Sequence, residues 1–179
     1  MVDLAIGPLS TVGSISLAAL RTNADCLSQL CALLQLPVIL LRAPLSPAAS
    51  EILPEVTRHL PNAIEVHHST NDSWEERSFV DAVTQSGRRQ LIFAGIATDV
   101  GVSLTALSAL RAGSQCALLT DVSGTLNPRV EQAAHLRLTQ AGVILTSWSS
   151  FAGEIQRDYT KGLGPQVLQI LRTAIQGNL

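Results

Sequence analysis

The sequence is poor in aromatic residues and in charge. Aromatic residues make up 3% of the chain and charged residues 15%, whereas 46% are apolar. A core must therefore be built from Leu, Ala, Val and Ile, and a disordered chain is disfavoured. The low charge and the positive mean hydropathy predict more apolar surface than a monomer buries, so we expect a homo-oligomer.

Long basic and long apolar runs are also absent, which disfavours two classes of partner. The longest basic run is Arg88–Arg89 and the net charge is -2, so we expect no nucleic-acid binding. The longest apolar stretch, Leu36–Leu41, falls far short of the roughly 18 residues of a membrane span. No signal peptide is recognisable before the domain, and we expect no membrane association.

Cysteine is scarce. The three cysteines are odd in number and lack framework spacing, which predicts a reducing, cytoplasmic location. Cys26 and Cys31 are five residues apart on a predicted helix, about 140° apart around its axis, so they do not form a ligand pair. We predict that both, together with Cys116, are small core residues.

Short apolar runs alternate with longer helical patterns along the chain. Each run has four to six residues rich in Val, Ile and Leu, which is typical of strands buried in a parallel sheet. The strand candidates are Val38–Leu41, Ala63–Val66, Leu91–Ile96, Ala117–Thr120 and Val143–Thr146. This alternation predicts one α/β domain over residues 1–179, a three-layer α/β/α sandwich around a doubly wound, mainly parallel, Rossmann-like sheet.

Several helices carry start and stop signals. A capping box at Ser73–Glu76 predicts a helix that stops at Gly87, and a cap at Asn127–Pro128 predicts one that stops at Gly142. A further helix is predicted over Val100–Ala112, closed by Gly113, and another is capped by Asn23 and runs to Gln35. We also predict a helix that starts at Ser46–Pro47 and ends at His59, and a last helix from Pro165.

The amino-terminal segment is the unusual part of this pattern. Met1-Val2-Asp3 resembles the last residues of a strand that would lie in the middle of the sheet. So short a central strand would leave backbone groups of its neighbours without partners. In this interpretation Asp3 ends a strand; alternatively, it belongs to a frayed terminus.

Ligands of open parallel sheets bind beyond the carboxyl ends of the strands. The residues that follow the predicted strands are therefore the candidates for a site. They are Asp3, Arg42, His67, Thr98–Gly101, Asp121, Ser123 and Ser147–Trp148.

The segment Ala94-Gly-Ile-Ala-Thr-Asp-Val-Gly-Val-Ser-Leu-Thr-Ala-Leu-Ser-Ala-Leu110 resembles the nucleophile strand, turn and helix of the isochorismatase-like cysteine hydrolases. The resemblance extends over nearly the whole chain, and it is closest to the oligomeric bacterial hydrolases of unknown substrate. It also involves Val2-Asp3 with Gly7, Thr120–Thr125, Ala141–Val143, Trp148 and Glu154–Asp158.

This resemblance implies hydrolysis of amide C–N or vinyl-ether bonds in small molecules by a thiolate, an aspartate base and a cation. Asp3 matches the aspartate, His67 lies near the cation position, and Gly101 stands at the nucleophile position. His67 and His68 alternate across the sheet, so at most one of them faces a cleft. The turn, with Ala97 and Thr98, would supply N–H groups to the substrate and often holds a cis peptide, here Ile96–Ala97 or Ala97–Thr98.

Other roles stay open for several of these residues. Trp74 and Trp148 either line a substrate pocket or pack in the core or an interface. Thr98 and Asp99 are predicted to cap the following helix, and Ser103 is a weak substitute nucleophile because no base adjoins it. The family's zinc-binding pattern is not present, so we expect no metal and no cofactor.

Two hypotheses follow. In the first, the chain is a hydrolase by ancestry that acts on a small molecule and is catalytically impaired by Gly101, because glycine has no side chain that can attack. In the second, it is a non-catalytic oligomer that binds a ligand or assembles with partners.

Overall fold

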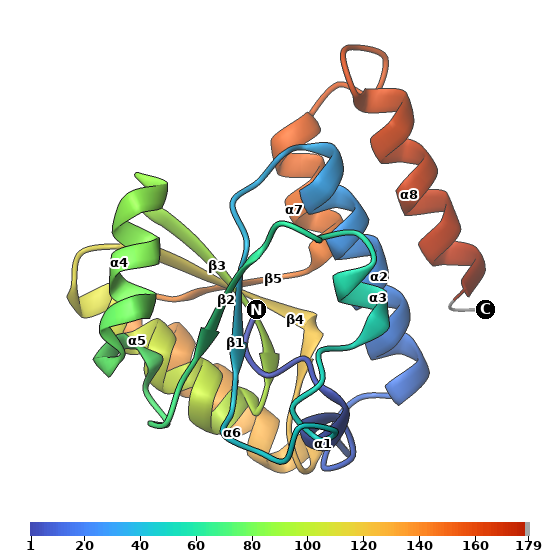
Figure 1. Cartoon of the computed structure of the whole chain (residues 1–179). Coiled ribbons are helices and arrows are strands. Elements are labelled where there is room, and N and C mark those ends of the chain that lie inside the picture. Colours follow the sequence, from blue (N-terminus) through green and yellow to red (C-terminus); the bar gives the residue numbers. More distant parts are fainter. Residues whose placement is uncertain (178–179) are drawn as a thin grey trace.

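The protein is described from a computed structural model, which covers residues 1–177. Five strands, each paired in parallel with a neighbouring strand, lie between two layers of helices (Figure 1). The strands are β1 (Ile39–Arg42), β2 (Ile64–His67), β3 (Gln90–Ile96), β4 (Gln115–Gly124) and β5 (Ile144–Thr146). The predicted three-layer α/β/α fold with a parallel sheet is confirmed.

Helices connect the strands in the order that the apolar pattern predicted. The helices are α1 (Ile6–Leu9), α2 (Leu17–Leu33), α3 (Pro54–Thr57), η1 (Ser73–Glu75), α4 (Arg77–Ser86), η2 (Thr98–Val102), α5 (Ser103–Arg111), α6 (Pro128–Ala141), α7 (Trp148–Gln156) and α8 (Gly164–Gly177). No helix within residues 1–177 is both long enough and apolar enough to cross a bilayer.

The amino-terminal segment joins two groups of strands. β1 pairs with β2, and β3 pairs with β4, which pairs with β5. Val2 lies between the groups and bridges Leu41 of β1 and Gly95 of β3 in parallel. Met1–Asp3 is therefore the end of a central strand, and Figure 1 shows the N-terminus in the middle of the sheet. Asp3 is buried, so the alternative of a frayed terminus is wrong.

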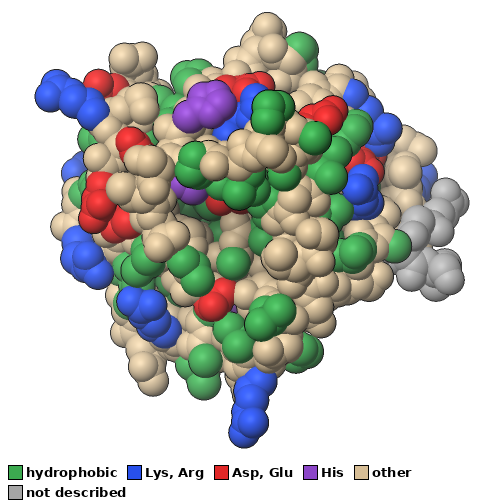
Figure 2. All heavy atoms as spheres, turned by 60° about the horizontal axis from the view of Figure 1, so that its bottom comes forward, with side chains coloured by type: hydrophobic (Ala, Val, Ile, Leu, Met, Phe, Trp, Pro, Cys, Tyr) green, Lys and Arg blue, Asp and Glu red, His purple; other side chains and the backbone are tan. Residues whose placement is uncertain are grey.

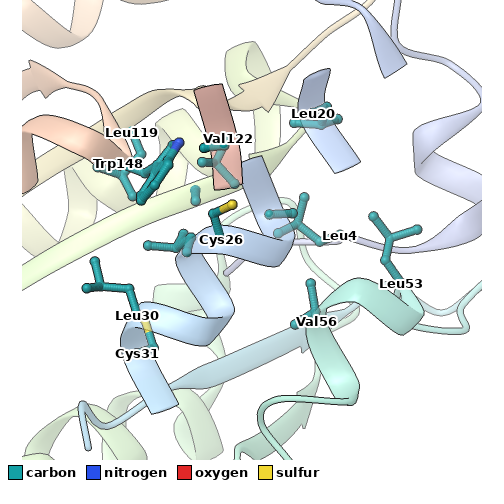
Figure 3. Packing of buried hydrophobic residues seen from close by; sticks show 14 of the residues in the cluster. Leu4, Leu20, Cys26, Leu30, Cys31, Leu53, Val56, Leu119, Val122 and Trp148 are labelled. Atoms are coloured by element: carbon teal, nitrogen blue, oxygen red, sulfur yellow. The ribbon is translucent and has the colours of Figure 1, made fainter. Parts of the chain in front are cut away.

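Each face of the sheet has its own apolar core. One core lies against α2, α3, α7 and α8, and Figure 3 shows part of it, including Cys26 and Leu30 of α2 and Trp148 of α7. The other core lies against α4, α5 and α6 and includes Val2, Phe93 and Leu118. All three cysteines are buried and unpaired, as predicted for core residues.

The helix boundaries predicted at Asn127, Gly87 and Gly142 are confirmed, because each of these residues acts on the helix next to it. Asn127 accepts hydrogen bonds from Arg129 N and Val130 N at 3.1 Å each. Gly87 and Gly142 end α4 and α6 in the left-handed conformation, with φ of 64° and 103°.

Three helix starts were predicted wrongly. Ser16, not Asn23, caps α2. Ser73–Glu75 forms a separate 3-10 helix capped by Asp72, and α4 begins only at Arg77. The helix predicted over Ser46–His59 is reduced to α3, because the preceding loop hydrogen-bonds to the amino-terminal segment, with Gly7 N to Ala49 O at 2.8 Å.

Candidate active site

Asp3 ends the central strand with its side chain buried. Its N–H donates to Leu41 O at 3.1 Å, and its Oδ1 accepts from Ala43 N at 2.7 Å. The residue has φ of 47°, a left-handed conformation that is uncommon outside glycine. Backbone bonds on both sides thus fix the carboxylate just beyond the strand's carboxyl end.

His68 is the partner of this carboxylate. Its Nε2 lies 3.0 Å from Oδ1 and 3.2 Å from Oδ2 of Asp3, and its Nδ1 lies 2.8 Å from Thr70 O. The hydrogen bond to Asp3 raises the pKa of the His68 imidazole, because the carboxylate favours its protonated form. The site therefore holds a buried carboxylate beside an imidazole whose protonated form it favours.

His67, which the sequence placed near the cation position, does not contact Asp3, whereas its neighbour His68 does. His67 is the last residue of β2 and is exposed, whereas His68 is 7% exposed. The alternation of side chains was expected, but the wrong member of the pair was chosen. Val66 gave the usable signal: it is buried, and side chains two residues apart share a face, so His68 points inward with it.

The turn after β3 is shaped by close backbone contacts. The peptide between Ile96 and Ala97 is cis, at one of the two predicted positions. A Cβ on Gly95 would lie 1.9 Å from Val2 O, and the residue has φ of 141°, so only glycine allows the central segment to pair here. The helical run then begins with η2 and continues into α5.

Gly101 lies buried in η2, beside the central segment. A Cβ at this position would lie 3.5 Å from Val2 Cγ1 and 3.9 Å from Asn71 O, which are ordinary contacts. The position therefore has room for a side chain, and it adjoins the residue that precedes Asp3. The sequence places no thiol here, and the buried Cys26, Cys31 and Cys116 each have a pKa raised by burial to about 11.

A buried carboxylate from α6 holds the turn in place. Thr98 Oγ1 donates to Glu131 Oε1 at 2.7 Å, and Ser14 Oγ donates to Glu131 Oε2. Asp99 accepts a hydrogen bond from Thr125 Oγ1. Thr98 and Asp99 therefore tie the turn to neighbouring segments, and the prediction that they cap the helix is wrong, since η2 has no side-chain cap.

The remaining candidates are used structurally. Ser103 Oγ is buried and donates to Thr98 O at 2.5 Å. Trp148 is 3% exposed, and its Nε1 donates to Asn23 Oδ1 at 3.2 Å. Trp74 packs edge-to-face on Phe79, with ring centroids 5.8 Å apart. Both tryptophans therefore make packing contacts, and a role in lining a substrate pocket stays a prediction.

A cavity of about 410 Å³, lined mainly by polar residues, adjoins Glu131 and Ser14. It is lined by Asp121, Glu131 and His135 among others, and burial raises the pKa of Asp121. Figure 2 shows the molecular face brought forward from the bottom of Figure 1; it is hollowed near its middle, with histidine and acidic side chains visible around the hollow. In the part of the chain that the structure describes, no group of three or more His, Cys, Asp and Glu side chains is arranged to hold a metal ion.

The structure thus combines a parallel sheet, an aspartate that ends its central strand, and a cis-peptide turn that leads into a helix. Residues 18–150 match the isochorismatase domain, and the chain belongs to this family.

Within the family the chain is similar to the YcaC-type hydrolases. It is 34% identical over 160 residues to the Probable hydrolase YcaC of Escherichia coli (strain K12), covering 89% of this chain and 77% of that protein. The crystal structure of the Escherichia coli YcaC gene product, described as an octameric hydrolase of unknown specificity, has a TM-score of 0.89 at 32% identity, covering 98% of this chain and 84% of that one. YcaC from Pseudomonas aeruginosa, solved with hexane-2,5-diol and covalent acrylamide, has a TM-score of 0.87 at 32% identity, covering 96% and 91%.

Proposed function

We propose that this isochorismatase-family hydrolase keeps a substrate cleft for a small molecule with an amide C–N or vinyl-ether bond but lacks the nucleophile that such chemistry uses. The observation that carries the proposal is the position of Gly101. It has room for a Cβ beside Val2, the residue that precedes Asp3 of the buried Asp3–His68 pair, yet it offers no attacking atom.

The remaining groups have definite roles in this proposal. Asp3 accepts a proton, His68 supplies the positive charge assigned from sequence to His67, and the N–H groups of the Ala97–Thr98 turn face the developing oxyanion. Any residual turnover then requires water as the nucleophile. Its oxygen bonds to the carbonyl carbon while Asp3 takes its proton, and the C–N bond then breaks as Asp3 returns that proton to the leaving amine.

Restoring a thiol tests this proposal. We expect Gly101→Cys to hydrolyse members of a panel of small amides at least a hundredfold faster than the unaltered chain, because removal of a covalent nucleophile costs roughly 10³–10⁶ in rate. Gly101→Ala is the matched control for volume, and Gly101→Cys with Asp3→Asn is the control for the base. Equal rates in the unaltered chain and Gly101→Cys, or rates insensitive to Asp3→Asn, would contradict the assigned roles.

A non-catalytic oligomer is the second candidate, and large exposed apolar residues favour it. Leu126, Leu136, Ile144 and Ile175 are 57–66% exposed. The similar Escherichia coli protein is described as octameric, and we propose a homo-oligomer for this chain too. A mass of 19.0 kDa by light scattering at micromolar concentration would contradict this.

We also propose a single domain over residues 1–179 and a cytoplasmic location. The three unpaired cysteines support a reducing compartment.

A further inference from the structure

Four neighbouring strands are each followed, within four residues of the carboxyl end, by an apolar side chain that is partly exposed. The central strand lies between β1 and β3, and β4 lies next to β3. We call these four side chains the apolar rim: Leu45 after β1, Ile6 after the central strand, Val100 after β3 and Leu126 after β4. Their exposed fractions are 46%, 42%, 38% and 66%. The apolar rim therefore lies at the edge of the sheet that holds Asp3 and Gly101.

Leu45 and Ile6 form the half of the apolar rim beside Asp3. Ala43 N donates to Asp3 Oδ1 at 2.7 Å. Leu45 lies two residues beyond Ala43, and Ile6 lies three residues beyond the aspartate. The two segments stay paired beyond the carboxylate, because Ile6 N donates to Glu51 O at 3.0 Å.

Val100 and Leu126 form the other half, beside Gly101. Val100 directly precedes Gly101 in the sequence. Thr125 Oγ1 donates a hydrogen bond to Asp99, and Leu126 and Val100 are the residues that follow these two. The base and the position of the missing nucleophile thus have apolar side chains on both sides. Figure 2 shows this face of the molecule, with hydrophobic side chains around its hollow.

Positive charge is scarce at the same edge of the sheet. The segments that leave the carboxyl ends of the central strand and of β1 to β4 contain no Lys and no Arg; they are residues 4–16, 43–53, 68–76, 97–102 and 125–127. The same segments contain the carboxylates of Glu51, Asp72, Glu75, Glu76 and Asp99. Their one histidine, His68, is buried and already bonded to Asp3.

Three arginines lie within two residues of these segments, and each is either bonded elsewhere or exposed to solvent. Arg42 donates to Ser50 O at 3.1 Å and to Glu65 Oε2 at 2.8 Å. Arg77 and Arg129 are exposed in the first turns of α4 and α6. A carboxylate at the apolar rim would therefore lose hydration beside acidic side chains, with no buried cation to replace it.

We propose that this site selects an uncharged amide with a short aliphatic chain and rejects an amide that carries a carboxylate. The assignment rests on the proposed function and adds the class of substrate: the amide group faces Asp3 and position 101, and the chain contacts the apolar rim. Each CH₂ buried there should tighten binding about fourfold. Hydrolysis consumes water and turns the neutral amide into a carboxylate and ammonium, so the acidic edge also favours release of the acid product.

Binding can be measured with the unaltered chain by saturation-transfer NMR. The probes are hexanamide, adipamate, which ends in a carboxylate, and ω-aminohexanamide, which ends in an ammonium group. We expect hexanamide to bind with a Kd on the order of 1 mM and adipamate roughly tenfold or more weakly. The ammonium compound should fall between them, because its charge must leave water at the apolar rim.

Two results of this comparison would overturn the proposal. Adipamate that binds as tightly as hexanamide would show that the edge does not reject a carboxylate. Aminohexanamide that binds more tightly than hexanamide would assign selection to the acidic groups and not to the apolar rim. Absence of binding by all three amides would overturn it as well.

Lysine substitutions locate the selection at the apolar rim. Leu126→Lys and Leu45→Lys each add a cation to one half of the rim, and each should shift the affinity ratio several-fold toward adipamate. Leu136→Lys is the matched control, because Leu136 is 57% exposed but lies roughly 12 Å along α6 from its start. An equal shift in this control overturns the proposal. So does a changed mass by light scattering with an unchanged ratio in the rim variants, since a second copy then covers the rim.

Turnover by Gly101→Cys separates the substrate class from the proposed function, with ammonium release as the readout. We expect kcat/KM to be highest for hexanamide and lowest for adipamate. If adipamate is hydrolysed as fast as hexanamide, the assigned substrate class is wrong and the hydrolytic role stands. If no amide is hydrolysed although the unaltered chain prefers hexanamide in binding, the hydrolytic role is wrong and the selection by the apolar rim stands.

Discussion

His68 Nε2 faces both carboxylate oxygens of Asp3, at 3.0 and 3.2 Å, although the two residues lie 65 positions apart in the sequence. Thr70 O, which can only accept, lies 2.8 Å from His68 Nδ1, so this nitrogen carries a hydrogen. With a carboxylate at the other nitrogen, the imidazolium form satisfies every contact. The pair is thus a buried charge pair that ties β2 to the central strand.

The Asp3–His68 pair should make stability depend on pH. Because the folded state raises the pKa of His68, its contribution is complete below the unfolded value of about 6.5 and disappears as pH rises through the raised folded value. We expect Asp3→Asn to lower the free energy of unfolding by roughly 1–3 kcal/mol at pH 5.5–6. The loss should become smaller at pH 9, as measured by urea denaturation.

His67 provides the matched control for that experiment. It is exposed, so His67→Gln should leave both the stability and its pH dependence nearly unchanged. If Asp3→Asn lowers the free energy of unfolding by the same amount at pH 6 and pH 9, the attraction between the two charges does not stabilise this contact.

Glu131 should be among the most sensitive positions outside the apolar core. It accepts hydrogen bonds from Thr98 and Ser14 and is 9% exposed. Glu131→Ala leaves both hydroxyls without their acceptor, so we expect a loss of about 2–4 kcal/mol. Glu154→Ala, on the exposed surface of α7, should change the free energy of unfolding by less than about 0.5 kcal/mol. A similar cost for both variants would show that Glu131 does not hold the turn.

The strand predictions succeeded because a buried parallel strand must be apolar on both faces. The observed strands differ from the predicted ones mainly at their ends. β4 is the largest difference, since it continues through Asp121 to Gly124, where its pairing with β3 resumes after an irregularity. No local pattern predicts this extension, because it follows a register shift between Phe93 and Gly95 of the neighbouring strand.

The wrongly predicted helix starts have the opposite cause, since their side chains bond to residues outside the helix that they were expected to cap. Asn23 looked like a cap but is buried, where it donates to Asp121 O at 2.8 Å. Glu76 looked like half of a capping box but accepts from Ser69 N at 2.7 Å. The Asp3–His68 contact likewise depends on where β2 ends, which the sequence placed one residue too early.

Asn23 itself offers a test of this interpretation. Its amide joins α2 to β4 through Asp121 O and to α7 through Trp148 Nε1. Asn23→Ala leaves the buried indole N–H without this acceptor, so we expect a loss of about 1–3 kcal/mol and a changed Trp148 fluorescence emission. Asn62→Ala, at an exposed position, should do neither. If Asn23 acted only as a helix cap, its replacement would lower the free energy of unfolding by about 1 kcal/mol but would leave the Trp148 emission unchanged.

A thiol at position 101 should react differently from the three natural thiols. Cys26, Cys31 and Cys116 are buried with pKa values of about 11, so the folded chain should be alkylated slowly by iodoacetamide at pH 7. Gly101→Cys places a thiol near the start of a helical run, beside the side chain of Val2, which precedes Asp3. We expect its alkylation, followed by mass spectrometry, to reach half its maximal rate below the pH of about 8.5 typical of free cysteine.

Ser149→Cys is the matched control for Gly101→Cys, because it places an exposed thiol in the first turn of α7 without an aspartate and histidine pair. If both thiols show the same pH midpoint, helix position alone accounts for the reactivity. If only Gly101→Cys shifts, and His68→Gln removes the shift, the imidazolium is responsible. Because Asp3 alone would repel a thiolate, such a result would assign activation of the nucleophile to His68 and proton acceptance to Asp3.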